Sequence, residues 1–172
     1  MSSPNYQGPR VHHRHSIRLP GFDYAGAGGF FLTICIDGHH CVLGEIQGGV
    51  HRLSPAGIAV ERTWDSLPGR FPTVHLDSHV VMPNHFHGIL WNGDPDEGIR
   101  DGESLPALGM IVGAFKSLST AAVNGIPPGR QGPLWQRGYY EHIIGGTRSL
   151  RRIRGYIEEN PVAWPRDRYY RG

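Results

Sequence analysis

The stretch Thr73–Trp91, TVHLDSHVVMPNHFHGILW, predicts two antiparallel strands joined by a tight turn. Apolar and polar side chains alternate at its start, and the apolar run Val80-Val81-Met82 continues this first strand. Pro83-Asn84 is a typical turn pair, and the segment His85–Trp91 that follows is again rich in aromatic and branched side chains. The apolar character on both sides of the turn indicates a hairpin at the centre of a sheet.

Patterns on either side of this hairpin predict the remaining elements. Ser54-Pro55 is an N-cap followed by a proline at the first helical position. We expect strands at 30–36, 41–46, 50–53 and 134–144, and helices at 55–67, 105–124 and 148–160. Hairpin strands that alternate with helices predict an α+β fold: a ferredoxin-like (RRM-like) sandwich, with an antiparallel sheet, helices on one face and an extra C-terminal helix.

The chain of 172 residues is long enough for one sizeable core and too short for a second. We expect an extended basic N-terminal arm at 1–28, a single domain at 29–164 and a short C-terminal tail at 165–172. No apolar run approaches the roughly 20 residues of a membrane helix and no secretory signal is visible, so a cytoplasmic protein is expected. Cys35 and Cys41 are then expected to be reduced packing residues.

His85 and His87 are the sharpest local feature of the hairpin. Side chains alternate along a strand, so both imidazoles are expected on one face, about 6–7 Å apart, with Phe86 on the other. Two imidazoles on one face can chelate a cation. Because the chain has eleven histidines, a chance spacing of two structural histidines is the alternative.

The last predicted helix carries a second candidate group. Leu150, Ile153 and Ile157 form its apolar stripe, and Tyr156 and Asn160 lie one helical turn apart at the border of that stripe. These two side chains are therefore expected to line a groove. A boundary tyrosine with a hydrated hydroxyl is the alternative.

The charge is unevenly distributed along the chain. The net charge is +2, yet residues 130–172 hold nine arginines against four acids, a surplus of +5. Arginine suits phosphate recognition better than lysine does, and Lys116 is the only lysine. The arginine-rich end therefore favours a nucleic-acid partner, with a solvated basic surface as the alternative.

Several spaced motifs together resemble a known family. They are VVMPNHFHG at 80–88, FKS at 115–117, LWQRGYYEH at 134–142 and YIEENP at 156–161, with SIRLPG at 16–21 before them. In this order and spacing they resemble the single-tyrosine HUH transposases and, among these, the REP-associated tyrosine transposases of bacteria. The resemblance spans roughly residues 14–164.

The resemblance implies an enzyme: a metal-dependent HUH transposase and single-stranded DNA nuclease. Such an enzyme cleaves and rejoins DNA beside imperfect-palindrome hairpins through a 5′-phosphotyrosine. Tyr156 would be the catalytic nucleophile, His85 and His87 the metal ligands, and Asn160 the polar residue that completes the metal site. The implied cofactor is Mg²⁺ or Mn²⁺, which suits a mixed set of imidazole, amide and water ligands.

The implied partner is single-stranded DNA with a REP-like hairpin, met by a monomer or homodimer in the cytoplasm, at the bacterial nucleoid and not at a membrane. The expected DNA-binding residues are Arg14, Arg18, Lys116, Arg137, Arg151, Arg152 and Arg154. The other tyrosines compete with Tyr156, but tyrosines on a strand or a tail are less well placed for in-line attack. These competitors are Tyr139, Tyr140, Tyr169 and Tyr170.

Two other functions fit the same residues. A hairpin DNA- or RNA-binding protein would keep the fold without the chemistry. A zinc-dependent hydrolase would use His85, His87 and a further histidine, but the chain has no HExxH spacing. His75 and His79 are expected at the surface, with a supporting role at the histidine pair as the alternative.

Overall fold

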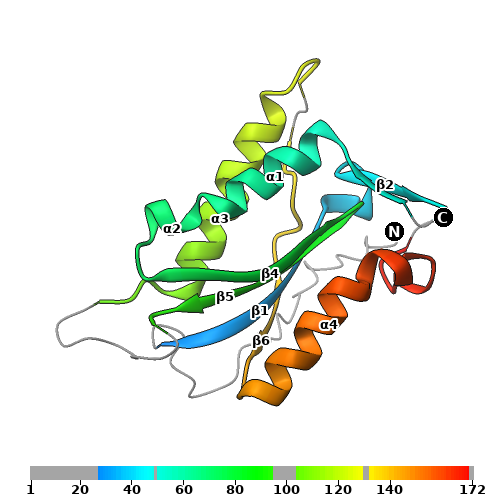
Figure 1. The fold of residues 1–172 in the computed structure, drawn as a ribbon. Coiled ribbons are helices and arrows are strands. Elements are labelled where there is room, and N and C mark those ends of the chain that lie inside the picture. The colour runs from blue at the N-terminus through cyan, green and yellow to red at the C-terminus, as the bar shows by residue number, and fades with distance from the viewer. Residues whose placement is uncertain (1–26, 49, 95–103, 130–131, 171–172) are drawn as a thin grey trace, which may run out of the picture.

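A four-stranded antiparallel sheet with the strand order β4-β5-β1-β6 lies at the centre of the fold (Figure 1). Its strands are β1, Gly28–Cys35; β4, Val74–Met82; β5, His85–Asn92; and β6, Tyr140–Ile143. The chain was studied as a computed structural model, which describes residues 27–48, 50–94, 104–129 and 132–170. Most of the predicted N-terminal arm, with Arg14 and Arg18, lies outside these residues.

The predicted hairpin forms β4 and β5, which pair from Val74 opposite Asn92 to Met82 opposite His85. Strand β1 pairs with the other side of β5, so β5 and β1 are the two central strands. Between β1 and the first helix, β2 (Gly44–Gln47) and β3 (Val50–Leu53) form a separate two-stranded sheet. The remaining order, strand-helix-strand-strand-helix-strand, is that of a ferredoxin-like sandwich.

Helices α1 (Pro55–Asp65), α2 (Leu67–Arg70) and α3 (Leu108–Asn124) lie on one face of the sheet (Figure 1). The predicted cap of α1 is confirmed, because Gly57 N donates a 3.1 Å hydrogen bond to Ser54 Oγ. Alternate residues of β1 and β5 point into this layer and build the main apolar core. Its largest fully buried side chains include Phe30, Leu32, Ile34, Trp64, Phe86, Leu90 and Phe115.

Helix α4 (Thr147–Ala163) lies on the opposite face of the sheet and leads into a short 3-10 helix, η2 (Trp164–Arg166) (Figure 1). The other set of alternate residues of β1 and β5 faces α4. A second, smaller apolar cluster forms there from Phe31, Ile89, Ile144, Ile153 and Ile157. The predicted fold class, with one extra C-terminal helix, is therefore confirmed.

Several predicted element boundaries were wrong: the strand expected at 41–46 and the helix expected at 105–124 both begin three residues later, and the first helix ends at Asp65. The strand expected at 134–144 is shortened to β6, because the carbonyls of residues 136–138 accept hydrogen bonds from the Lys116 ammonium instead of from a strand. Helix α4 was expected to end before Pro161 but continues to Ala163. Proline removes one hydrogen bond of the last turn, and the buried Trp164 holds that turn against the protein. Within the described ranges, no helix has the length and apolarity needed to cross a membrane.

Candidate active site

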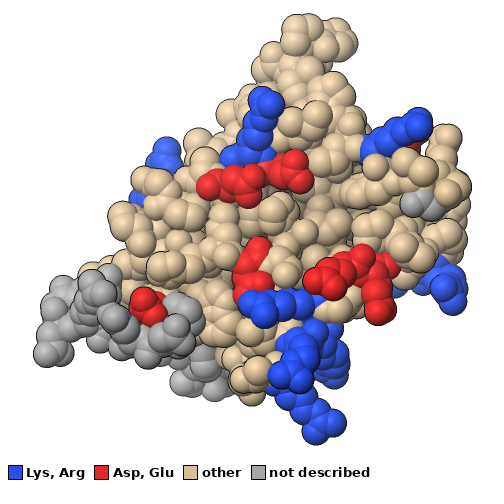
Figure 2. All heavy atoms as spheres, viewed as in Figure 1, with Lys and Arg blue, Asp and Glu red and all other residues tan. Residues whose placement is uncertain are grey.

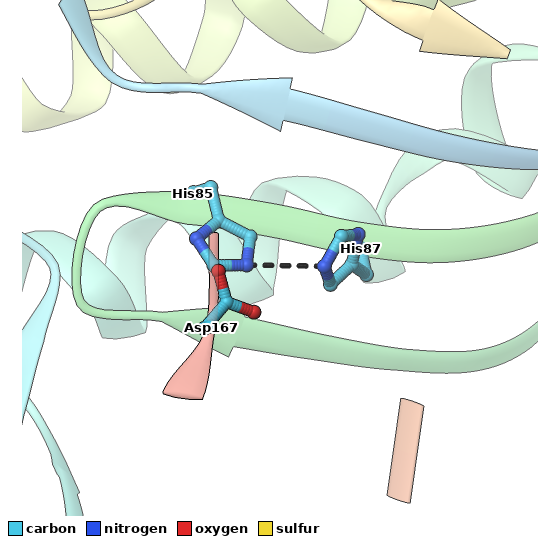
Figure 3. Close-up of side chains that lie close together, drawn as sticks. All are labelled: His85, His87 and Asp167. Carbon is cyan, nitrogen blue, oxygen red and sulfur yellow. Dashed lines mark hydrogen bonds between the residues drawn. The ribbon is translucent and has the colours of Figure 1, made fainter. Parts of the chain in front are cut away.

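His85 and His87 come together on the α4 side of β5, as strand alternation predicted, and both are almost fully buried. Phe86 between them points to the other face, where its ring lies 4.7 Å from that of Trp64. The imidazoles converge more than expected: their ring centroids are 4.5 Å apart and their Nε2 atoms only 3.0 Å apart (Figure 3). The pair therefore presents two ring nitrogens to one point.

Asn84 determines which nitrogen of His85 carries the proton. Its amide nitrogen donates to the carbonyls of His39 and Tyr169, at 3.1 and 2.7 Å, so Asn84 Oδ1 faces His85 Nδ1 at 2.9 Å. Because Oδ1 can only accept, His85 Nδ1 donates and Nε2 is left with a free lone pair. This is the tautomer that a metal ligand requires.

Burial keeps both histidines neutral. Burial, followed by the neighbouring His87, lowers the pKa of His85 to about 2, and burial lowers the pKa of His87 to about 3. His87 Nδ1 lies 2.9 Å from the Thr33 hydroxyl, which orients the ring as Asn84 orients that of His85. Neutral, oriented imidazoles are ready to coordinate a cation without first losing a proton.

Tyr156 reaches this pair from α4 of the same chain. Its hydroxyl lies 3.3 Å from His87 Nε2, and its ring packs edge-on against the rings of His87 and Phe31. Burial raises the pKa of Tyr156, and a hydrogen bond from Asn160 offsets only part of this rise. The residue is 45% exposed, so Tyr156 lies next to the histidines and is still accessible to a substrate.

The donor set around the histidines fits a divalent cation. The side-chain oxygen of Asn160 is buried and has no hydrogen-bond partner among the described residues. It therefore keeps its lone pairs for a cation. Asp167, after η2, brings a carboxylate oxygen within 4.8 Å of both histidine nitrogens (Figure 3). Two nitrogens bound to one ion at about 2.1 Å and at right angles would lie about 3.0 Å apart, close to the separation found here. Imidazole and oxygen donors together suit Mn²⁺, Mg²⁺ or Zn²⁺.

The tail supplies two groups that sequence patterns did not predict at this site. The ring of Tyr169 lies 4.7 Å from that of His85, although a tail tyrosine was expected to be poorly placed. Its hydroxyl accepts a hydrogen bond from Arg168. Asp167 gave no signal beyond being an acid in a basic segment. The return of the chain after α4 depends on contacts with Asn84 and not on any periodic pattern.

The expected DNA-binding residues that the structure describes differ in whether their charged groups already have partners within the protein. Arg151 and Arg152 are exposed on α4, and Arg137 is exposed before β6. Figure 2 shows basic side chains gathered over the N-terminal part of α4. Arg154 instead pairs with Asp77 of β4, with N–O distances of 2.8 and 2.6 Å, and all three donors of Lys116 can be taken up by backbone carbonyls.

A pocket of about 310 Å³ adjoins Tyr156 on the same face. Its lining residues are Phe31, Tyr140, His142, Arg152, Ile153 and Tyr156. It therefore brings aromatic side chains and one arginine together beside Tyr156. His79 lies elsewhere, between Glu61 and the ring of Trp64 on the other face of the sheet, and His75 is exposed. Both cysteines are free; Cys35 is buried, but Cys41 is exposed and is not the packing residue that was expected.

Comparison with known proteins gives a relative in sequence and a neighbour in structure. No family model matches the chain. An uncharacterized protein of Haemophilus influenzae is 34% identical over 175 residues, covering 93% of this chain and 94% of that protein. The solved structure of the REP-associated tyrosine transposase bound to a REP hairpin has a TM-score of 0.60 at 20% identity, covering 85% of this chain and 73% of that one. The chain therefore belongs to one family with the Haemophilus influenzae protein and has the fold of the REP-associated tyrosine transposase, the group that its motifs resemble.

Proposed function

We propose that this protein is a metal-assisted transposase-type nuclease that cleaves and rejoins single-stranded DNA beside imperfect-palindrome hairpins. The observation that carries the proposal is the approach of Tyr156 to the histidine pair, with 3.3 Å between its hydroxyl and His87 Nε2. A nucleophile and two metal ligands meet there on one face of the sheet. The arrangement forms within one chain, which favours attack in cis.

Tyr156 needs help to act as a nucleophile. A tyrosine with an ordinary pKa near 10 is only about 0.1% phenolate at neutral pH, and burial raises the pKa of Tyr156 further. A divalent cation, Mg²⁺ or Mn²⁺, held by His85, His87 and Asn160 would neutralise phosphate charge and polarise the P–O bond. The Asn160 amide hydrogen bond supports the negative charge that develops on the attacking oxygen.

The covalent step joins the Tyr156 oxygen to phosphorus and breaks the bond between phosphorus and the 3′ oxygen. The phenol proton leaves to solvent, and the departing oxygen takes up a proton to become a 3′-hydroxyl. The product is a 5′-phosphotyrosine that keeps the energy of the phosphodiester. Attack by a 3′-hydroxyl on this link therefore rejoins DNA without ATP.

The surface beside Tyr156 supports a single-stranded substrate. Unpaired bases stack on aromatic side chains, and arginine pairs with phosphate, which matches the pocket formed by Phe31, Tyr140 and Arg152. Arg137 and Arg151 are exposed for further phosphate contacts, and Arg14 and Arg18 are proposed to add to them from the arm. The structural neighbour is bound to a REP hairpin, which supports a hairpin as the partner here. Such a partner fits a protein of the cytoplasm that meets DNA at the nucleoid.

A cleavage assay with a matched pair of tyrosine variants tests the proposal. Oligonucleotides that carry imperfect-palindrome hairpins with single-stranded flanks are incubated with protein and Mn²⁺, and products are separated on a denaturing gel. We expect a covalent protein–DNA adduct that Tyr156→Phe reduces by at least about a thousandfold, because the attacking oxygen is gone. Tyr169→Phe keeps its ring against His85 and should keep the adduct.

Three outcomes contradict parts of this proposal. An adduct that persists in Tyr156→Phe and disappears in Tyr169→Phe would move the nucleophile to the tail. Hairpin binding that needs no metal, with no adduct from any oligonucleotide, would indicate a DNA- or RNA-binding protein without catalysis. Hydrolysis of small substrates with Zn²⁺ and no DNA binding would indicate the hydrolase.

A further inference from the structure

Among the residues that the structure describes, Asp167 is the acidic residue whose carboxylate lies close to both histidines. Among the described residues, His85, His87 and Asp167 are the only set of three or more histidine, cysteine or acidic side chains whose donor atoms lie close enough to share a cation. All three donor atoms lie within 4.8 Å of one another. Figure 3 shows the carboxylate beside the two imidazoles, on a segment separate from the strand that carries them.

The segment that carries Asp167 is held in place at several points. Trp164 is buried, with its ring 6.0 Å from that of His85, and Asp167 N donates to Trp164 O at 3.0 Å. Tyr169 N donates to Asp167 Oδ1 at 2.6 Å, and the carbonyl of Tyr169 accepts from Asn84. Because Asn84 also orients His85, the carboxylate and the histidine are positioned by one connected network.

A carboxylate supplies what the other donors lack. Two neutral imidazoles and the Asn160 amide bring no negative charge to a site in which His85, His87 and Asn160 are all buried. A divalent cation in such surroundings gains from a charged oxygen ligand. A carboxylate accepts at both of its oxygens, so the bond from Tyr169 N leaves further capacity on Asp167.

We propose that Asp167 is a further ligand of the divalent cation, so that the segment after α4 completes the metal site. The inference rests on the proposed function only in taking His85 and His87 as the metal pair. It makes the segment 164–170 part of the active site and not a tail.

Direct metal titration of the full chain, without DNA, tests this role. Mn²⁺ binding is followed by calorimetry and by the loss of the free-ion signal in electron paramagnetic resonance. Asp167→Asn keeps an acceptor for Tyr169 N while removing the charge, and we expect it to weaken Mn²⁺ binding by about tenfold or more. Asp65→Asn makes the same change at an exposed position at the end of α1 and should leave the affinity unaltered.

His85→Ala separates failure of the inference from failure of the proposed function. If Asp167→Asn binds Mn²⁺ as the wild type does while His85→Ala loses binding, Asp167 is not a ligand and the metal-assisted function stands. If His85→Ala also binds normally, the histidine pair is not the metal site and the proposed function falls with it.

A ligand-swap variant gives a signature that a merely structural role would not produce. Asp167→Cys would place a thiolate at this position, and Co²⁺ bound to a thiolate has a strong near-ultraviolet charge-transfer band. We expect the band in Asp167→Cys and not in the wild type or in Asp65→Cys. The wild type shows whether the native Cys35 and Cys41 bind Co²⁺, and Asp65→Cys shows whether an added surface thiol does. A folded Asp167→Cys that binds Co²⁺ without this band would overturn the proposal.

Discussion

The two faces of the central sheet carry different kinds of side chain on the same two strands, β1 and β5. On the face covered by α1 and α3, β1 and β5 present Phe30, Phe86 and Leu90 to an apolar core. On the face covered by α4, the alternate positions of the same strands present Thr33, His85 and His87, and all three are buried. The α1 and α3 face of these strands is therefore apolar, whereas the α4 face combines a smaller apolar cluster with a buried polar group.

This difference points to the α4 face as the one that carries the functional site. Buried polar groups cost free energy unless they are paired, and the two buried histidines have dedicated partners, Asn84 for His85 and Thr33 for His87. Apolar residues at these positions would pack without needing such partners. A polar network in a place that an apolar core could fill is typical of a functional site.

Neighbouring substitutions on β5 should separate the two faces, and this is the largest effect we expect. Phe86→Ala should lower the free energy of unfolding by about 3–5 kcal/mol, because it empties the core beside Trp64 and Phe115. His87→Ala should instead abolish metal-dependent cleavage while the protein still unfolds cooperatively. Urea denaturation and the adduct assay on both variants provide the comparison.

Phe86→Leu is the control for the core, since it retains an apolar side chain and should recover most of the lost stability. The contrast between the faces breaks down if His87→Ala unfolds the protein as far as Phe86→Ala does.

The Asp77–Arg154 pair tests how α4 is attached to the sheet. Burial alone would raise the pKa of Asp77, but hydrogen bonds from Arg154, Ser78 and Trp91 outweigh it and lower the pKa to about 2. A carboxyl with a depressed folded-state pKa adds stability above its unfolded pKa near 4 and loses it as the pH falls towards 2. Asp77→Asn should therefore cost about 1–2 kcal/mol at pH 7, discounted because Arg154 is 46% exposed, and less at pH 2.

Thermal unfolding of the wild type and Asp77→Asn between pH 7 and pH 2 measures this effect. The two melting curves should approach one another as the pH falls. A difference that stays constant across this range would show that the ion pair contributes nothing.

The smallest expected effect concerns the exposed surface of the α4 face. Arg152→Ala removes one guanidinium group from the pocket beside Tyr156. It should weaken binding to a hairpin oligonucleotide and reduce the slope of log affinity against log salt by about 1, because one fewer phosphate is neutralised. Arg62→Ala, which changes an exposed arginine on α1 at the opposite face of the sheet, is the control. Equal salt slopes for wild type and Arg152→Ala would remove Arg152 from the DNA path.

Local patterns predicted what depends on nearest neighbours. Strand alternation placed His85 and His87 together, and helical spacing placed Tyr156 and Asn160 one turn apart. The same reasoning overestimated the distance between the two imidazole rings. It considers the spacing of the residues along the strand and not the direction in which the rings turn.

Features that depend on distant contacts were not predicted. Asp167 and Tyr169 reach the site because Asn84, 85 residues earlier than Tyr169, binds the returning backbone. DNA contact by Lys116 and Arg154 stays a prediction, but their partners within the protein, backbone carbonyls for Lys116 and Asp77 for Arg154, were not predicted. No periodic pattern in sequence indicates which partner a long side chain will find in the fold.

The Asn84 amide has a practical consequence for handling the protein. The Asn84 side chain hydrogen-bonds both the backbone of Tyr169 and the ring of His85. Limited proteolysis at the exposed Arg166 or Arg168 would therefore cut the segment that holds Asn84 in position. Resistance to trypsin at these two arginines therefore reports on the order of the histidine pair.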